Sequence, residues 1–246
     1  MKTHAVAVAD AHLDGFNEEL RQFLTFLAAL SERSVHTLYI LGDLFTIWLG
    51  TPRLQCAYQQ PVLEALQTLK TRGMVIKYVE GNRDYFLSPY YVDAPFAEIA
   101  SEYTSEDIGT RSFYFSHGDL VNLRDKQYRA WRKISRNKML YAAFTCFPRF
   151  MTVRLVNYLE HAFRGTNQKH KATFPAEICA TYARHVLQTG YDVVVLGHFH
   201  EARQQEFLLE NRRKSLYVLP AWKDTPTYLQ ISEQGDVEFQ RFENSP

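Results

Sequence analysis

Residues 4–12 read HAVAVADAH, an apolar run of small and β-branched residues that stops at Asp10 and His12. A short apolar run bounded by polar residues predicts a buried strand. Helical spacing and further apolar runs then alternate along the chain, at 16–32 (helix), 37–41 (TLYIL, strand), 56–72 (helix) and 74–79 (MVIKYV, strand). This alternation predicts βαβ units and a mainly parallel sheet.

The last quarter of the chain lacks such helical segments. Residues 192–196 (DVVVL) predict another buried strand, and short strand patterns separated by turn residues follow at 206–209, 215–219, 227–231 and 237–242. Consecutive strands without helices predict an antiparallel meander. Together, the two halves predict an α/β sandwich of two sheets with helices on its outer faces.

The middle of the chain, about 125–187, predicts a long helical stretch that is strongly basic. Residues 122–171 hold twelve Lys or Arg and two acids, a net +10, so the rest of this +1 chain carries −9. Large apolar residues lie between these charges, a pattern typical of a helical cap that meets lipid or a membrane interface. The alternative is a solvated basic face over an ordinary helical core.

We expect one folded domain over residues 1–246 with a helical insertion at about 125–171. Of the 246 residues, 46% are hydrophobic and 22% are charged, enough to bury a substantial core. The three cysteines lie far apart and form no CxxC pair, which argues against a disulfide framework and a zinc ribbon. Neither a secretory signal nor a transmembrane run is present in the sequence, so we expect a cytoplasmic protein.

Five short polar motifs stand at the ends of apolar runs: Asp10-Ala11-His12, Gly42-Asp43, Gly81-Asn82-Arg83-Asp84, Ser116-His117-Gly118-Asp119 and Gly197-His198-Phe199-His200. Each motif alone fits ordinary turn chemistry or a structural histidine. In open α/β sheets, however, the loops at the carboxyl ends of strands form the functional site. We therefore expect all five motifs to meet.

The motifs supply oxygen and nitrogen donors without a thiolate. The candidate metal ligands are Asp10, His12, Asp43, Asn82, His117, His198 and His200. This donor set suits Mn²⁺, Fe²⁺ or Zn²⁺ in a catalytic site. Seven ligands suit two ions with open positions, and Asp43 is the carboxylate best placed to bridge them. Two ions about 3.5–4 Å apart favour attack on a phosphoryl group, so the motifs predict phosphoester or pyrophosphate hydrolysis.

The order DxH, GD, GN, H, GHxH across residues 10–200 resembles the calcineurin-like metallophosphoesterase superfamily. The resemblance implies a four-layer αββα sandwich and two divalent ions, with Mn²⁺ the expected metal. It assigns Asp10, His12, Asp43 and His200 to one ion. It assigns Asp43, Asn82, His117 and His198 to the other.

Further residues point to one family within this superfamily. The chain has Arg83 in GNRDYFL, where most of the superfamily has histidine, and LGDLF precedes Trp48 and Gly50. With Asp125, Tyr128 and the stretch YVLPAWKDTPTYLQI, these features are similar to the UDP-2,3-diacylglucosamine hydrolases of lipid A synthesis. One departure is Phe199 in GHFH, where the family commonly has GHTH.

This second resemblance implies an activity: a metal-activated hydroxide attacks the phosphorus next to uridine and releases UMP and 2,3-diacylglucosamine 1-phosphate. The helical insertion would then be a lid over two acyl chains. The implied partners are the lipid nucleotide-sugar substrate and, peripherally, the inner membrane surface of a Gram-negative-type bacterium. No nucleic acid is expected.

The expected catalytic residues are Asn82, Arg83, Asp84 and His117. The expected substrate contacts are Arg83, Asp125, Tyr128, Arg132, Asn167, Lys169, Lys171 and His198. Arg83 can grip pyrophosphate oxygens with its forked guanidinium, and its alternative role is a salt bridge to Asp84. We expect Asp84 to orient Asn82 or a ligand histidine.

Two other functions compete with this one. The chain could be another metallophosphoesterase, a nucleotide pyrophosphatase or a nuclease whose basic insertion holds a nucleic acid backbone. It could also be a non-enzymatic peripheral membrane binder with a structural metal centre. The complete set of candidate ligands argues against the last.

Overall fold

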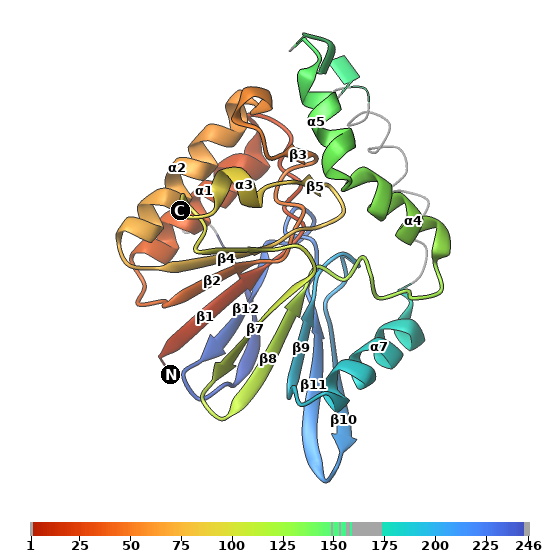
Figure 1. The fold of residues 1–246 in the computed structure, drawn as a ribbon. Coiled ribbons are helices and arrows are strands. Elements are labelled where there is room, and N and C mark those ends of the chain that lie inside the picture. The colour runs from red at the N-terminus through yellow and green to blue at the C-terminus, as the bar shows by residue number, and fades with distance from the viewer. Residues whose placement is uncertain (1, 149, 153, 156–157, 159–173, 244–246) are drawn as a thin grey trace.

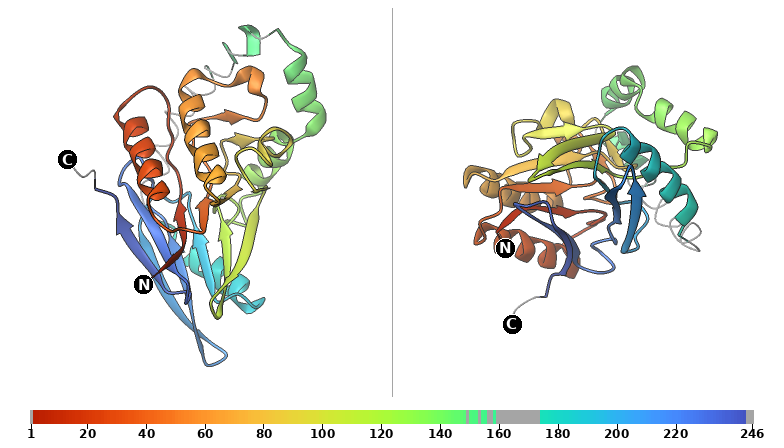
Figure 2. Two further views of the ribbon diagram at one scale, coloured as in Figure 1. Left: turned by 90° about the vertical axis from the view of Figure 1, so that its left-hand side faces the viewer. Right: turned by 90° about the horizontal axis from the view of Figure 1, so that it is seen from below.

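The computed structural model describes residues 2–148, 150–152, 154–155, 158 and 174–243. Two β-sheets stack face to face, and helices cover both outer faces (Figures 1 and 2). Helices α1 (Glu18–Ser31) and α2 (Gln60–Thr71) pack on the first sheet, and α7 (Ala176–Gln188) packs on the second. The expected αββα sandwich is confirmed.

The first sheet has the strand order β13-β12-β1-β2-β4-β6. Its members are β1 (Thr3–Val8), β2 (Thr37–Ile40), β4 (Val75–Val79), β6 (Glu98–Ala100), β12 (Thr227–Ser232) and β13 (Val237–Arg241). Strands β1, β2, β4 and β6 run parallel to one another, as the sequence pattern predicts for the first three. Their carboxyl ends therefore point to one edge.

The second sheet has the order β10-β11-β9-β8-β7. Its members are β7 (Tyr103–Ile108), β8 (Arg111–Ser116), β9 (Val193–Leu196), β10 (Arg203–Leu209) and β11 (Arg212–Val218). The central strands β8, β9 and β11 are parallel to one another, and β7 and β10 pair antiparallel at the two edges. The sheet thus also sends three strand ends toward one edge.

The predicted C-terminal meander is wrong. β10 and β11 form an antiparallel hairpin, but β11 returns to lie parallel to β9. β12 then leaves this sheet and pairs antiparallel with β1 in the other one. The reason is that β12 is buried on both faces, as an inner strand of a covered sheet: Leu229 and Ile231 lie between the sheets, whereas Tyr228 packs on the side of α1.

Local signals explain where the covering helices begin. The predicted helix at 16–32 begins only at Glu18, because the Asn17 side chain accepts a hydrogen bond from the Leu20 N–H and caps it. Phe16 therefore stays outside the helix and is exposed. In the predicted helix at 56–72, the 3₁₀ turn Ala57–Gln59 precedes α2, and another 3₁₀ turn, Pro52–Leu54, lies just before that range.

The middle of the chain forms α4 (Lys126–Ser135) and α5 (Lys138–Cys146), which rise beside the carboxyl ends of the strands (Figure 1). Among the described side chains of α5, none is fully buried: Tyr141 and Phe144 are half-buried, and Met139 and Leu140 are exposed. This part of the insertion thus leaves apolar surface open to solvent. None of the described helices is both long enough and apolar enough to cross a membrane.

Three smaller elements complete the fold: the two-residue strands β3 (Trp48–Leu49) and β5 (Asp84–Tyr85), which pair in parallel, and the short helix α3 (Ser88–Tyr91). β5 lies within the loop that follows β4. This pairing ties the loop to residues just beyond β2.

Candidate metal centre

The five polar motifs follow β1, β2, β4, β8 and β9, and the parallel strands bring them to one edge. Five of the seven candidate ligands have positive φ angles: Asp10 (54°), His12 (45°), Asp43 (53°), His198 (70°) and His200 (58°). Non-glycine residues seldom adopt this left-handed conformation, and it concentrates at functional sites. The backbone at these strand ends is thus bent to aim the side chains.

Glycine is required where two of these loops touch. Gly42 has a φ of 78°, and a Cβ on it would lie 2.6 Å from Gly81 Cα and 2.7 Å from His117 Nδ1. Any side chain at position 42 would therefore displace the Gly81 loop or the histidine. The glycines of the GD and GN motifs allow the loops carrying Asp43 and Asn82 to approach each other closely.

The first group of donors comes from Asp10, His12 and His200. The two Nε2 atoms lie 3.2 Å apart, and Asp10 Oδ1 lies 3.6 Å from His12 Nε2 and 3.4 Å from His200 Nε2. Three atoms with lone pairs thus face a common point. Asp10 Oδ1 is buried and has no hydrogen-bond partner among the described residues. A cation at that point would satisfy all three, so these residues fit a divalent metal.

The second group surrounds His117. Its Nε2 lies 3.1 Å from Asn82 Oδ1, 3.2 Å from His198 Nδ1 and 3.8 Å from Asp43 Oδ2. Its Nδ1 donates to the carbonyl oxygen of Leu41 (2.7 Å), so Nε2 is the ring atom that faces the other donors. The donors of Asp10, Asp43 and His117 lie within 4.8 Å of one another, which joins the two groups.

Burial keeps two of the imidazoles uncharged. It lowers the pKa of His12 to about 3 and, together with the charge of His117, the pKa of His198 to about 4. Neutral imidazole is the form that binds metals. Burial and the neighbouring Asp10 carboxylate raise the pKa of Asp43, because two carboxylates share a site remote from water. Two divalent cations would offset that repulsion.

Asp84 braces the loops from beneath. Its Oδ2 accepts hydrogen bonds from the N–H groups of Asp43 (2.9 Å) and Gly81 (2.8 Å) and from Tyr78 OH (2.8 Å). Burial and the charge of Asp43 raise its pKa to about 6. We expected Asp84 to orient Asn82 or a ligand histidine. Its hydrogen bonds instead hold the backbone of Asp43 and Gly81 in place.

Arg83 is buried and faces both the donors and a cavity. Its Nε lies 3.7 Å from Asp43 Oδ2, its Nη1 donates to the carbonyl of Thr46 (3.2 Å), and its N–H donates to Asp43 Oδ1 (2.9 Å). The guanidinium is thus set beside the candidate bridging carboxylate.

The cavity above the donors has a volume of about 720 Å³. Polar residues of the motifs line it, among them His12, Asp43, Asn82, Arg83, His198 and His200. Its lining also includes Asp125 and Tyr128 and the apolar side chains of Trp131, Phe174 and Ile178. The cavity thus combines polar groups with aromatic and aliphatic ones. An amphiphilic phosphate-bearing ligand fits such a space.

The expected substrate contacts divide into three groups. Arg83, Asp125, Tyr128 and His198 line the cavity. Arg132 is buried, pairs with Asp119 and donates to the carbonyl of Ser101, so it turns toward the protein. Asn167, Lys169 and Lys171 lie outside the described residues, as does most of the insertion beyond residue 158.

Some residues of the site escaped the sequence prediction. Asp119 accepts hydrogen bonds from Tyr128 OH and Arg132. The HGD motif was the only feature of the sequence that pointed to this residue. Asp224 Oδ2 lies 3.9 Å from His200 Nδ1, beyond hydrogen-bond distance but near enough for an ionic contact, and Asp224 lines the cavity. Asp224 lies in the stretch WKDTPT. This stretch contributed to the family resemblance, but the resemblance assigned no role to Asp224.

No family model matches the chain. Curated relatives nevertheless align over nearly its whole length, and those named here are each called "UDP-2,3-diacylglucosamine hydrolase". The relative from Aromatoleum aromaticum is 28% identical over 244 residues, 97% of each chain. That from Xanthomonas campestris is 29% identical over 240 residues, 93% of this chain and 95% of its own. That from Psychromonas ingrahamii is 23% identical over 231 residues, 92% of each.

Solved structures share the fold. The structure described as a novel archaeal phosphodiesterase superposes with a TM-score of 0.51 and 13% identity, and covers 97% of this chain and 99% of its own. The chain thus has the metallophosphoesterase fold, and its relatives are hydrolases. The two His/Asp groups of this chain fit a site for divalent metals.

Proposed function

We propose that this chain, as a member of the UDP-2,3-diacylglucosamine hydrolases, cleaves the pyrophosphate bond of UDP-2,3-diacylglucosamine to UMP and 2,3-diacylglucosamine 1-phosphate. One observation carries the proposal: the donor side chains meet at a cavity that is also lined by Trp131, Phe174 and Ile178. Phosphoryl chemistry fits the donors, and an acylated sugar fits the apolar lining. The full-length similarity to relatives of that name supports the same substrate.

The proposed metal is Mn²⁺, at two positions. Asp10, His12, Asp43 and His200 would hold one ion, and Asp43, Asn82, His117 and His198 the other. When bound, the ions would supply positive charge to the phosphoryl oxygens and make a water molecule more acidic. The chain prepares these positions by holding His12 and His198 neutral and by fixing the His117 ring on the Leu41 carbonyl.

Arg83 is the proposed phosphate-binding residue. The Thr46 carbonyl and Asp43 hold its guanidinium in the lining of the cavity. A forked guanidinium can donate to two phosphate oxygens at once, which orients the pyrophosphate over the donors. Burial strengthens this interaction because little water competes for it.

The apolar part of the cavity lining is the proposed site of the acyl chains. Trp131 of α4, Ile178 of α7 and Phe174 belong to it. Tyr128 also lines the cavity, and its OH donates to Asp119. The hydrophobic surface of the substrate would be removed from water here, which favours the acylated sugar over its unacylated counterpart.

We also propose that the protein associates peripherally with the inner membrane surface from the cytoplasmic side. α4 and α5 expose Trp131 (49% of its surface), Met139 (82%) and Leu140 (55%) to solvent, on a segment rich in basic residues. Apolar side chains among basic ones suit an anionic bilayer surface. Flotation with vesicles of phosphatidylethanolamine and phosphatidylglycerol tests this, and Met139→Ser with Leu140→Ser should reduce the bound fraction.

The activity itself is tested by UMP release from UDP-2,3-diacylglucosamine, with UDP-N-acetylglucosamine and bis(p-nitrophenyl) phosphate as comparison substrates. We expect Mn²⁺-dependent release from the diacyl substrate, loss of release with a chelator, and poor turnover of the unacylated sugar. Hydrolysis of simple diesters or of nucleic acid without turnover of the diacyl substrate would contradict the proposal and favour a different metallophosphoesterase.

A further inference from the structure

Arg136 reaches from the end of α4 into the loop that carries Asn82 and Arg83. It stands directly after the last residue of α4, and its Nη2 donates to the carbonyl oxygens of Gly81 (2.6 Å) and Asp84 (3.1 Å). Those two carbonyls flank Asn82 and Arg83 along the chain. One guanidinium nitrogen thus fixes the backbone on both sides of a candidate metal ligand and the proposed phosphate-binding residue.

The guanidinium of Arg136 also contacts the side chains of Tyr85 and Glu80. Its Cζ lies 5.6 Å from the centre of the Tyr85 ring, within the range of a cation–π interaction. Its Nε lies 3.9 Å from Glu80 Oε2. The side chains of Arg136 and Glu80 are only 16% and 8% exposed. Hydrogen bonds to a charged donor in such surroundings are strong and directional.

The same loop is held from the other side by the sheets. Asp84 Oδ2 accepts from the N–H groups of Gly81 and Asp43, and the Arg83 carbonyl accepts from the Trp48 N–H (2.9 Å) in the β3–β5 pair. Successive carbonyls of a strand point in opposite directions, so the Asp84 carbonyl faces away from β3. A buried carbonyl on that side needs a donor, and Arg136 provides one.

α4 is itself attached to the second loop of the site. Arg132, one turn before Arg136 on the same face, pairs with Asp119 and donates to the Ser101 carbonyl. Asp119 is two residues beyond His117. α4 therefore connects the loop of His117 with the loop of Asn82, and Arg136 is its contact with the latter.

We infer that Arg136 is a positioning residue for pyrophosphate hydrolysis: it sets the places of Asn82 and Arg83 through two backbone carbonyls. The inference rests on the proposed function for the reaction it serves. Arg136 need not touch the substrate in this role. A lysine could not reproduce it fully: its ammonium group can donate to both carbonyls, but it has no planar guanidinium to lie over the Tyr85 ring at the same time.

The test compares Arg136→Ala, Arg136→Lys and the control Lys133→Ala, which removes an equal charge from an exposed position on the same helix. Mn²⁺ affinity is measured without substrate, by electron paramagnetic resonance of the free ion. kcat and KM are measured with the diacyl substrate and with bis(p-nitrophenyl) phosphate. Circular dichroism shows that each variant is folded.

We expect Arg136→Ala to bind one Mn²⁺ about tenfold more weakly, as when a group that orients a ligand is removed. We also expect its kcat to fall about 10- to 100-fold on both substrates with KM nearly unchanged, since the reacting groups are misplaced. Arg136→Lys should lie between the alanine variant and the unmodified protein, and Lys133→Ala should match the latter.

The inference is overturned if Arg136→Ala keeps its Mn²⁺ affinity and kcat, or if only KM for the diacyl substrate rises. Should Arg136→Ala fail to fold, the same readings are taken on Arg136→Lys, and full affinity and full kcat there overturn the inference as well. If the unmodified protein does not turn over the diacyl substrate, the proposed function fails. The Mn²⁺ titration and the diester assay then still decide the role of Arg136.

Discussion

The N–H of His198 donates a 2.7 Å hydrogen bond to Asp10 Oδ2, although 188 positions separate the two residues. The bond joins the end of β1 in the first sheet to the end of β9 in the second. The other oxygen of the same carboxylate faces His12 and His200. One buried side chain thus both fastens the sheets and presents an oxygen to the candidate metal position.

Asp10→Asn separates these two tasks. The amide can still accept from His198 but brings no negative charge to the metal position. We expect the variant to fold and to lose at least about 100-fold in Mn²⁺ affinity and activity, since even groups behind the ligands contribute 10- to 100-fold. Metal titration and UMP release measure this. Asp107→Asn, at an exposed position of β7, is the control, and equal behaviour of the two variants would exclude Asp10 as a ligand.

Arg83→Lys tests the proposed phosphate contact. The substitution keeps the positive charge near Asp43 but removes the fork that can hold two phosphate oxygens. We expect kcat/KM to fall about 100-fold, the scale of losing one donor to a developing charge. Mn²⁺ affinity should stay within about threefold, since Arg83 contributes no ligand atom. A loss of metal affinity as large as the loss of activity would instead assign Arg83 a structural role.

Metal removal should destabilise the protein. Asp10 and Asp43 are buried side by side, and no cation other than Arg83 and the histidines offsets them among the described residues. Mn²⁺ at about 100 times its dissociation constant should add about 2.7 kcal/mol to the free energy of unfolding. For a chain of this size that raises Tm by about 5–10 °C. Scanning calorimetry of chelated and reloaded protein measures the shift, which Asp10→Asn should largely abolish.

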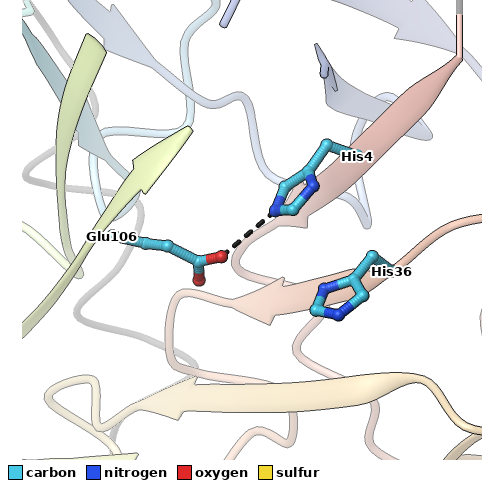
Figure 3. Close-up of side chains that lie close together, drawn as sticks. All are labelled: His4, His36 and Glu106. Carbon is cyan, nitrogen blue, oxygen red and sulfur yellow. Dashed lines mark hydrogen bonds and ion pairs between the residues drawn. The ribbon is translucent and has the colours of Figure 1, made fainter. Parts of the chain in front are cut away.

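Glu106 links the sheets at the opposite ends of the strands (Figure 3). Its Oε1 lies 3.1 Å from His4 Nε2, and its Oε2 accepts from Lys77 Nζ (2.8 Å) and Tyr39 OH. Burial alone would raise the pKa of Glu106, but these hydrogen bonds outweigh it and lower the pKa to about 2. Because the folded-state pKa lies below the ordinary 4.5, the ionised carboxylate stabilises the fold above that pH.

We therefore expect the stabilisation from Glu106 to disappear as the pH falls from about 5 toward 2. Glu106→Gln should lower the free energy of unfolding at pH 7 by about 1–3 kcal/mol, the scale of hydrogen bonds to a charged group. The difference between variant and unmodified protein should shrink in acid. Urea unfolding at several pH values checks this, with the exposed Glu210→Gln as control. A difference that does not depend on pH would contradict the assignment.

The place of the site was predictable from sequence because it depends on a simple rule: polar residues at the carboxyl ends of parallel strands meet. Asp10, Asp43 and His117 each follow an apolar run, and the structure brings them within 4.8 Å. The strands β6 and β7 were not expected. Residues 103–108 (YTSEDI) alternate between exposed and buried at a sheet edge, and this pattern contains few apolar residues.

Arg132 and Arg136 show where sequence reasoning stops. Both lie in a run of basic residues, and their charge suggested a negatively charged ligand. Which face of α4 turns inward depends on Asp119, Glu80 and two backbone carbonyls that only the folded chain brings near. The pairing of β12 with β1 could not be predicted for the same reason. The residues of a strand do not by themselves show which of two sheets the strand joins.

The entry of β12 between β13 and β1 has a consequence for synthesis on the ribosome. β1 emerges first, yet its second neighbour is made only when residues 227–232 have been translated. Until then β1 is an open edge with unpaired amides, a template for association with other nascent chains. Premature termination before Thr227 would leave that edge permanently uncovered, so truncated products should aggregate rather than persist as partly active enzyme.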